Sequence, residues 1–381
     1  MMTSTEADDP GHPGHPAVPR GVAILLGAGA AVVLLSGMRA ASGFVAPVML
    51  ALVLTIAVAP VRQVALRHRW PSWAATLVAL VTAYLIVLVL ALSLAVSAVK
   101  LATTIPQYAD EADDLVANLK GWLTDQGLDE STLQDALGQL DIGKVADLLT
   151  GVLGGLLGVL GSFFFLVTVL FFTTADVAGV PLRDALLKES KPRLAASMQG
   201  FVHATQHYLI MSAIFGGIVA VLDTGALWLL GVPLPALWGL LAFVTNFIPN
   251  IGFVIGLVPP AILGLLEGGW SMFFAVIAVY CVLNVVIQTF IQPRYVGDAV
   301  GLSPTVTFLS LALWTFVLGS LGALLAVPMT LLARAILVDP DPSAGWARAF
   351  IGSTPQPPAE PPPVEQPVDD PAVDDPAPST A

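Results

Sequence analysis

The sequence contains little charge and almost no cysteine. Only 11% of its 381 residues are charged, whereas 56% are hydrophobic; ordinary soluble domains carry roughly 25% charge. A soluble protein this apolar would aggregate. The composition therefore argues against a cytosolic enzyme or a nucleic-acid-binding protein and indicates an all-α, polytopic membrane protein whose partner is the lipid bilayer. The single cysteine, Cys281, excludes an intrachain disulfide and a cysteine metal cluster.

Signatures of catalysis are also missing. The chain has no Walker A loop, no G-x-S-x-G elbow and no H-E-x-x-H motif. His203 and His207 stand four residues apart, but no third ligand is evident. We therefore expect no enzyme activity, no cofactor and no metal site.

The acidic residues are concentrated in two segments. The net charge of −12 comes from 15 basic and 27 acidic residues. The segment 100–150 holds ten acids and three lysines, and the segment 339–381 holds eight acids and one arginine. Both should be exposed to water. Proline, aspartate and alanine dominate 339–381, so we expect this tail to be disordered, like the polar residues 1–20.

Between the tails lie eight apolar runs long enough to cross a bilayer, which takes about 20 helical residues. We expect about eight transmembrane helices, divided into a group of three (21–99) and a C-terminal transport bundle (151–338). The runs cover residues 21–38, 43–61, 71–99, 151–175, 207–231, 232–266, 268–293 and 299–333.

Basic residues in the short loops predict the orientation. The loop after the second run carries Arg62, Arg67 and Arg69, and the segment 178–206 carries four further basic residues. Such loops are cytoplasmic in most membrane proteins. With eight crossings, both termini then lie in the cytoplasm, and the acidic segment 100–150 lies outside.

The segment 100–150 has its own helical pattern. Its apolar residues recur at three- and four-residue spacing, which is typical of an amphipathic helix; they are Ile105, Tyr108, Ala112, Leu115, Leu119 and Trp122. Such a helix either caps the bundle or contacts a neighbouring subunit.

One acid falls deep within a predicted membrane helix. Asp223 precedes the expected helix end at Gly231 by eight residues, which places it near the middle of the bilayer. An ionised carboxylate there needs a partner or a wet cavity. Asp223 is either a neutral residue bonded to a neighbouring helix or a group that couples transport to protons.

The seventh run carries a stripe of amides. Asn284, Gln288 and Gln292 are spaced by four residues and so share one helix face. This face should point into the bundle, either to bond another helix or to line a pathway. Arg294, just beyond Pro293, is an interfacial anchor or a substrate ligand.

The sixth and eighth runs each hold 35 uncharged residues. At about 1.5 Å per residue, a straight helix of this length would overshoot a hydrocarbon core of about 30 Å. In the sixth run Pro249 frees backbone carbonyls, and Asn246, Asn250 and the flexible Gly252 surround it. In the eighth run the interruptions are Gly319, Gly322 and Pro328. We expect both runs to be broken or re-entrant, a feature that marks central binding sites in transporters.

These two regions resemble the autoinducer-2 exporter family of bacterial membrane proteins. The resemblance rests on "NFIPNIGFVIGLVPPAILGLL" and on "IQPRYVGDAVGLSPTVTFLSLALWTFVLGSLGALLAVPMTLL", and it covers about residues 20–338. Onto this sequence it carries Asn246, Pro249, Gly252, Pro259, Pro293, Gly297, Pro304, Gly322 and Pro328. Many relatives have an acidic residue shortly before the proline that matches Pro293, where this chain has Ile287.

The resemblance implies eight membrane helices in the bacterial plasma membrane and the export of a small polar solute similar to autoinducer-2, coupled to an ion gradient. It also implies an alternative function, a monovalent cation/proton antiporter, and it is compatible with a homo-oligomer. A membrane scaffold that transports nothing is a further alternative. Intramembrane Asn, Gln and Asp residues favour transport.

Overall fold

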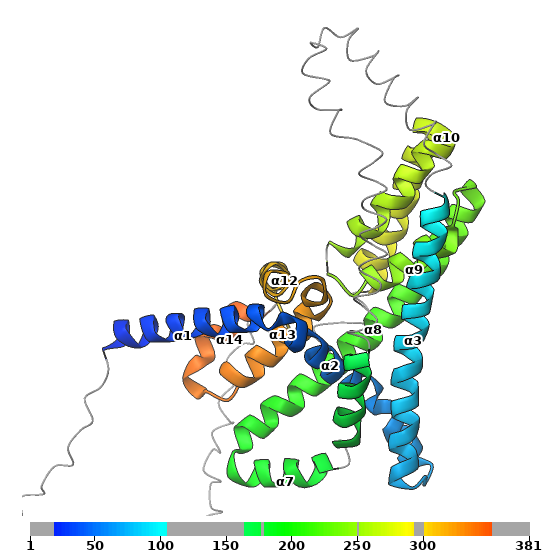
Figure 1. Ribbon diagram of the computed structural model, residues 1–381. Helices are drawn as coiled ribbons and strands as arrows, with labels where there is room; N and C mark the ends of the chain where they lie inside the picture. The colour runs from blue at the N-terminus through cyan, green and yellow to red at the C-terminus, as the bar shows by residue number, and fades with distance from the viewer. Residues whose placement is uncertain (1–18, 105–163, 177–178, 250, 293–300, 353–381) are drawn as a thin grey trace, which may run out of the picture.

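The computed structural model describes residues 19–104, 164–176, 179–249, 251–292 and 301–352. Within these ranges the regular elements are all helices, which confirms the predicted all-α membrane fold (Figure 1). Most of the predicted outer segment 100–150, together with Asn250, Arg294 and residues 353–381, lies outside the described residues.

The N-terminal part consists of three apolar helices. They are α1 (Arg20–Ala40), α2 (Ser42–Arg67) and α3 (Ser72–Thr104). Small residues allow close packing, since Ala51, Ala79 and Ala83 are buried together with Leu170 of the helix Phe164–Asp176. In contrast, α1 projects from the bundle with most of its described side chains exposed (Figure 1).

The segment 178–206, treated above as a loop, is largely helical. It forms α7 (Val180–Ser190) and the first turns of α8 (Pro192–Leu230). The side chain of Phe201 explains the difference, because it is buried in an apolar cluster with residues of α2 and α13. At about 1.5 Å per residue α8 is about 58 Å long, so it extends well beyond a hydrocarbon core of about 30 Å.

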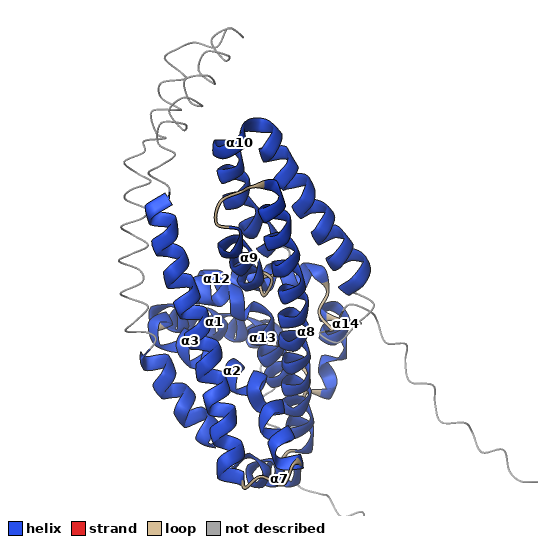
Figure 2. Ribbon diagram, turned by 90° about the vertical axis from the view of Figure 1, so that its right-hand side faces the viewer, coloured by secondary structure: helices blue, strands red, loops and turns tan. Residues whose placement is uncertain are grey.

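The sixth predicted run is broken, as expected. Its first part is α9 (Pro235–Thr245), and its second part begins α10 (Gly252–Asn284). Gly269, with a φ of 67° and a ψ of −162°, interrupts α10. This conformation is essentially restricted to glycine. We call residues 252–267 the first arm and residues 270–284 the second arm; Figure 2 shows them meeting at the top of the molecule.

The eighth run forms a hairpin of α12 (Pro304–Leu318) and α13 (Ser320–Leu337). The break lies at Gly319, whose φ of 69° and ψ of −150° are close to those of Gly269. Ser303 caps α12 by accepting a hydrogen bond from the Val306 amide. The expected break at Pro328 is wrong, because this buried proline lies inside a continuous α13.

The predicted disordered tail begins too early. Residues 342–344 form a short helical turn, and α14 (Gly345–Ile351) follows. Arg334 binds the Asp339 carboxylate and the Gly301 carbonyl, and the Ser303 amide donates to the Ile351 carbonyl at 2.9 Å. These contacts extend the folded region at least to Ile351.

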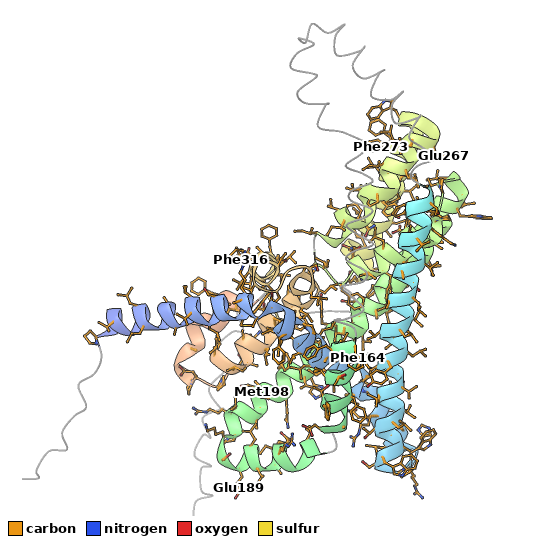
Figure 3. The ribbon with its side chains drawn as sticks, in the orientation of Figure 1. Phe164, Glu189, Met198, Glu267, Phe273 and Phe316 are labelled. Carbon is orange, nitrogen blue, oxygen red and sulfur yellow. The ribbon has the colours of Figure 1, made fainter. Side chains whose placement is uncertain are left out.

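The surface fits a bilayer. Five described helices are long and apolar enough to cross a membrane, and shorter apolar helices accompany them. In Figure 3 the charged Glu189 of α7 lies at the foot of the molecule, whereas Glu267 lies near the opposite end. Exposed aromatic side chains, among them Phe164 and Phe316, lie between these two levels.

Candidate functional site

The carboxylate of Asp223 projects from α8 into the interior. The helix is held at this end by Gly231, whose φ of 78° is left-handed, and by a hydrogen bond from the Val232 amide to the Leu227 carbonyl. The Asp223 side chain is 0% exposed, and neither of its carboxylate oxygens has a hydrogen-bond partner. Buried polar groups are nearly always paired, so this carboxylate is a candidate to bind a proton, a cation or the donor group of a solute.

A re-entrant hairpin, formed by α9 and the first arm of α10, makes the second wall. The chain reverses after α9, and we call the described residues 246–249 of this reversal the tip. Gly252 lies directly against the Thr245 carbonyl, and Gly256 faces Ala242 and Thr245. The two segments therefore run antiparallel in close contact. With 11 residues, α9 is about 16 Å long, shorter than a hydrocarbon core of about 30 Å, which is the length expected of one side of a re-entrant hairpin.

The second arm of α10 and the π-helix that follows it, Val285–Ile291 (η3), supply two amides. Asn284 donates to the Tyr280 carbonyl, and Gln288 donates to the Asn284 side-chain oxygen, both at 2.9 Å. Each amide thus orients the next. Single π-helical turns often occur at functional sites.

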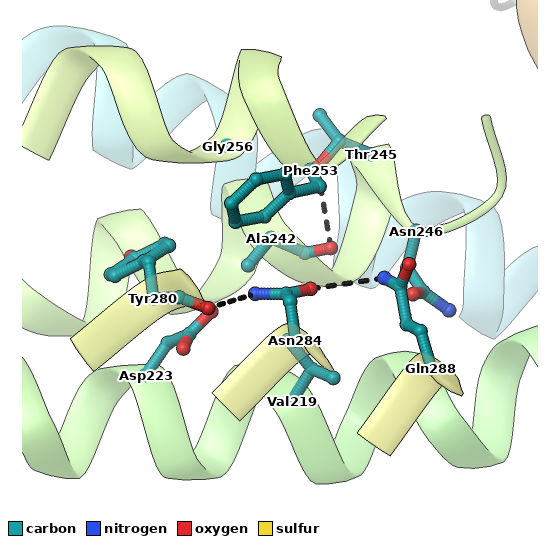
Figure 4. A pocket seen from close by; sticks show the side chains of 10 residues that line it. All are labelled: Val219, Asp223, Ala242, Thr245, Asn246, Phe253, Gly256, Tyr280, Asn284 and Gln288. Atoms are coloured by element: carbon teal, nitrogen blue, oxygen red, sulfur yellow. Dashed lines mark hydrogen bonds between the residues drawn. The ribbon is translucent and has the colours of Figure 1, made fainter. Parts of the chain in front are cut away.

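These walls line a partly open pocket, whose roughly 220 Å³ of empty space includes the solvent at its mouth. Figure 4 shows Asp223 on one side and the linked amides of Asn284 and Gln288 beside it. Ten residues line the pocket: Val219, Asp223, Ala242, Thr245, Asn246, Phe253, Gly256, Tyr280, Asn284 and Gln288. The enclosed part of this space is small, so it suits an ion or a small solute.

The chemistry of the lining is polar but almost without charge. Asp223 carries the one carboxylate, and the hydroxyl of Tyr280 is also buried without a hydrogen-bond partner. Together with the side chains of Asn246 and Thr245, these groups can donate hydrogen bonds to a polar solute, accept them, or surround a cation with oxygens. In the described part of the chain, no group of three His, Cys, Asp or Glu residues could hold a metal ion.

The pocket brings together four of the residues predicted from the sequence: Asp223, Asn246, Asn284 and Gln288. Pro249 and Gly252 do not line it but shape the tip. Gln292 follows the π-helix and is half-buried outside the lining, so the predicted stripe is cut short.

Two polar lining residues, Thr245 and Tyr280, were not predicted from the sequence. Thr245 precedes Asn246 directly, and Tyr280 stands one helical turn before Asn284, so their positions beside predicted residues were the available signal.

Ile287, which stands where many relatives have an acidic residue, packs beside this pocket. Ile287 is 3% exposed and belongs to a buried cluster with Phe215, Val219 and Ala242. Two of these three neighbours, Val219 and Ala242, line the pocket. In this chain the side chain at 287 is therefore a packing residue, and the carboxylate of the pocket comes from α8.

Comparison with known proteins gives one family. The family described as AI-2E family transporter matches residues 25–339. The chain is 32% identical over 318 residues to the AI-2 transport protein TqsA of Escherichia coli (strain K12), covering 83% of this chain and 92% of that protein. It is 30% identical to the putative transport protein YhhT of the same strain, covering 81% and 88%. A putative transport protein of Haemophilus influenzae is 28% identical over 86% of this chain and 95% of its own length. These matches confirm the resemblance drawn from the sequence.

Proposed function

The chain belongs to the AI-2E family of membrane transporters, and on this premise we propose that it exports a small polar solute, coupled to an ion gradient, through the pocket around Asp223. A relative named as an AI-2 transport protein supports a solute of that kind. We further propose that the protein lies in the bacterial plasma membrane with both termini in the cytoplasm, as its basic loops indicate.

The observation that carries this proposal is the unpartnered carboxylate of Asp223 in a polar pocket. A buried carboxylate without a fixed cation can take up and release a proton or bind a cation as the pocket fills and empties. Tyr280 is the other titratable side chain in the lining. One carboxylate beside neutral amides supports a cycle in which the pocket binds an ion and a solute in turn.

Flux measurements in proteoliposomes test the proposal. We expect export of a small hydroxylated solute to accelerate under an imposed proton gradient. With Asp223→Asn, which keeps the shape but cannot ionise, the acceleration should vanish. Equal flux and equal pH profiles in the wild type and Asp223→Asn would show that Asp223 is not the group that couples transport to protons. The absence of solute and cation flux in well-folded liposomes would instead favour the scaffold.

A monovalent cation/proton antiporter is the second candidate. The small volume of the pocket and its oxygen-bearing side chains from Asp223, Asn284 and Gln288 favour it. Sodium-driven proton movement in liposomes without any organic solute would distinguish this function from solute export.

A further inference from the structure

The tip of the re-entrant hairpin is tied to α8 by two side-chain hydrogen bonds. The Tyr208 hydroxyl donates to the Phe247 carbonyl at 2.7 Å, and the Asn246 amide donates to the Ser212 carbonyl at 2.9 Å. The donor of the first bond lies on α8, and the donor of the second lies on the tip. We call this pair of bonds the latch.

Gly216 on α8 makes room for the latch. A Cβ atom built on Gly216 would lie 3.1 Å from the side-chain nitrogen of Asn246 and 3.2 Å from its Cβ. The adjacent Gly217 has nothing within 4 Å of such an atom. The chain thus offers a matched pair of glycines, one under the latch and one away from it.

The latch lies on the α7 side of the pocket. On α8, the contact at Ser212 comes seven residues, about two helical turns, before Val219 of the pocket lining. Asn246 belongs to both, since it lines the pocket and bonds to Ser212. Movement of the tip therefore changes the wall of the pocket directly.

An apolar contact supports the tip. Ile248 packs against a buried cluster that includes Trp314, Leu318 and Leu325 of the α12–α13 hairpin, and Leu209 of α8 packs against the same cluster. Polar bonds and apolar packing together close this side of the pocket.

The turn of the other hairpin bonds to itself among the described residues. There the Gly319 amide donates to the Thr315 carbonyl and the Gly322 amide donates to the Gly319 carbonyl, so both bonds stay within the hairpin. The first hairpin instead depends on α8, through bonds that can break while both elements stay folded. Two ordinary hydrogen bonds are few enough to allow a minor open population.

From this geometry we propose that the tip is the gate of the pocket on the α7 side, and that it opens when Tyr208 and Asn246 release their carbonyl partners. This gate rests on the proposed function, because it gives the pocket a role in transport. Tyr208 acts here as a positioning residue, since it does not line the pocket.

Thiol accessibility tests the gate without requiring transport. In a Cys281→Ser background, Ala242→Cys places one thiol in the pocket lining of the purified, reconstituted full chain. The measured quantity is its rate of reaction with a small water-soluble thiosulfonate. Tyr208→Phe should raise this rate about threefold to tenfold, the factor expected for the loss of one hydrogen bond. Gly216→Ala should act in the same direction, and Gly217→Ala should leave the rate unchanged.

The outcomes separate the gate from the transport proposal. Unchanged reactivity in folded Tyr208→Phe protein overturns the gate, whatever the flux. Raised reactivity in Tyr208→Phe supports the gate even where no solute or ion flux is found, and the proposed function then fails alone. Raised reactivity in Gly217→Ala equal to that in Gly216→Ala would show general loosening of α8 and would also overturn it.

Discussion

Two helical hairpins in this protein use the same backbone device for different ends. In each, a glycine lies against a carbonyl of the preceding helix: Gly252 against Thr245, and Gly322 against Trp314. The first hairpin opens into a polar pocket and leans on α8. The second closes on itself, with the Trp314 indole donating to Thr330 at 2.9 Å inside an apolar cluster. Close glycine packing thus fixes the hairpin shape, whereas the polar side chains beside it decide whether the hairpin encloses a site.

The largest effect should come from adding a methyl group at the glycine that contacts a backbone carbonyl in each hairpin. Gly252→Ala and Gly322→Ala would each drive a Cβ atom into a backbone carbonyl that cannot move aside cheaply. We expect each to lower the free energy of unfolding by about 3 kcal/mol, the upper end of overpacking costs. Thermal melting in detergent measures this. Gly217→Ala, which meets nothing within 4 Å, is the control and should be neutral or stabilising by up to about 1 kcal/mol.

If only one of the two glycine variants melted early, the hairpins would not share the device.

The next largest effect should come from removing the charge of Asp223, because the carboxylate beside the first hairpin has no counterpart in the apolar cluster of the second. Asp223→Asn should reduce gradient-driven flux by roughly tenfold or more, as for the loss of one interaction with a charged group, and should remove its pH dependence. Asp184→Asn is the control. The hydrogen bond from Lys188 is the main cause that lowers the pKa of Asp184, so this exposed carboxyl is ionised throughout the neutral range. A loss of pH dependence in Asp184→Asn would contradict the assignment to the pocket.

Pro249 and Pro328, one in each hairpin, should differ in their effect on transport rather than on stability. Pro249→Ala should let the tip wind further into helix and reduce flux severalfold in folded protein. Pro328→Ala restores an amide donor inside a helix that is already continuous, so flux should be unchanged and stability should shift by less than about 1 kcal/mol. Flux in proteoliposomes, normalised to folded protein, checks both. Equal flux in the two variants would remove the functional distinction between the hairpins.

The smallest effect concerns the support of the second hairpin. Removing residues 353–381 should leave the melting temperature unchanged. Removing residues 339–381 also deletes Ile351, which packs beside α13, and should lower the free energy of unfolding by about 1–2 kcal/mol, as for partial burial of one isoleucine. Melting of the two truncated proteins side by side measures the difference. Identical melting would mean that α14 contributes nothing to the hairpin.

The sequence was informative wherever one residue type has one physical consequence. Long uncharged runs predicted membrane helices, and Pro249 among asparagines predicted a break that the structure has. Asp223, Asn284 and Gln288 were identified because polar groups are costly in hydrocarbon. That they share one pocket depends on the re-entrant hairpin, which brings α8 against the second arm of α10.

Errors arose where tertiary packing decides. Gly319, Gly322 and Pro328 all looked capable of breaking the eighth run, but only Gly319 has a positive φ. A proline inside a helix is tolerated when neighbouring helices support the freed carbonyl. Tyr280 escaped notice because a tyrosine in an apolar run carries no distinctive signal. The tail boundary was wrong because Arg334 bonds to the nearby Asp339, and Ser303, far back in the sequence, bonds to Ile351.

The π-helix Val285–Ile291 has a consequence for how this region tolerates changes in length. Each π-helical hydrogen bond encloses one more residue than an α-helical bond does, so the segment stores a surplus residue. A single-residue deletion there would let the segment close into ordinary α-helix. Residues beyond the segment would then keep nearly their present orientation relative to Asn284, because the residue removed is the surplus one. A single-residue deletion within this segment should therefore be far less harmful than one in the second arm of α10, where it would rotate every later residue by about 100°.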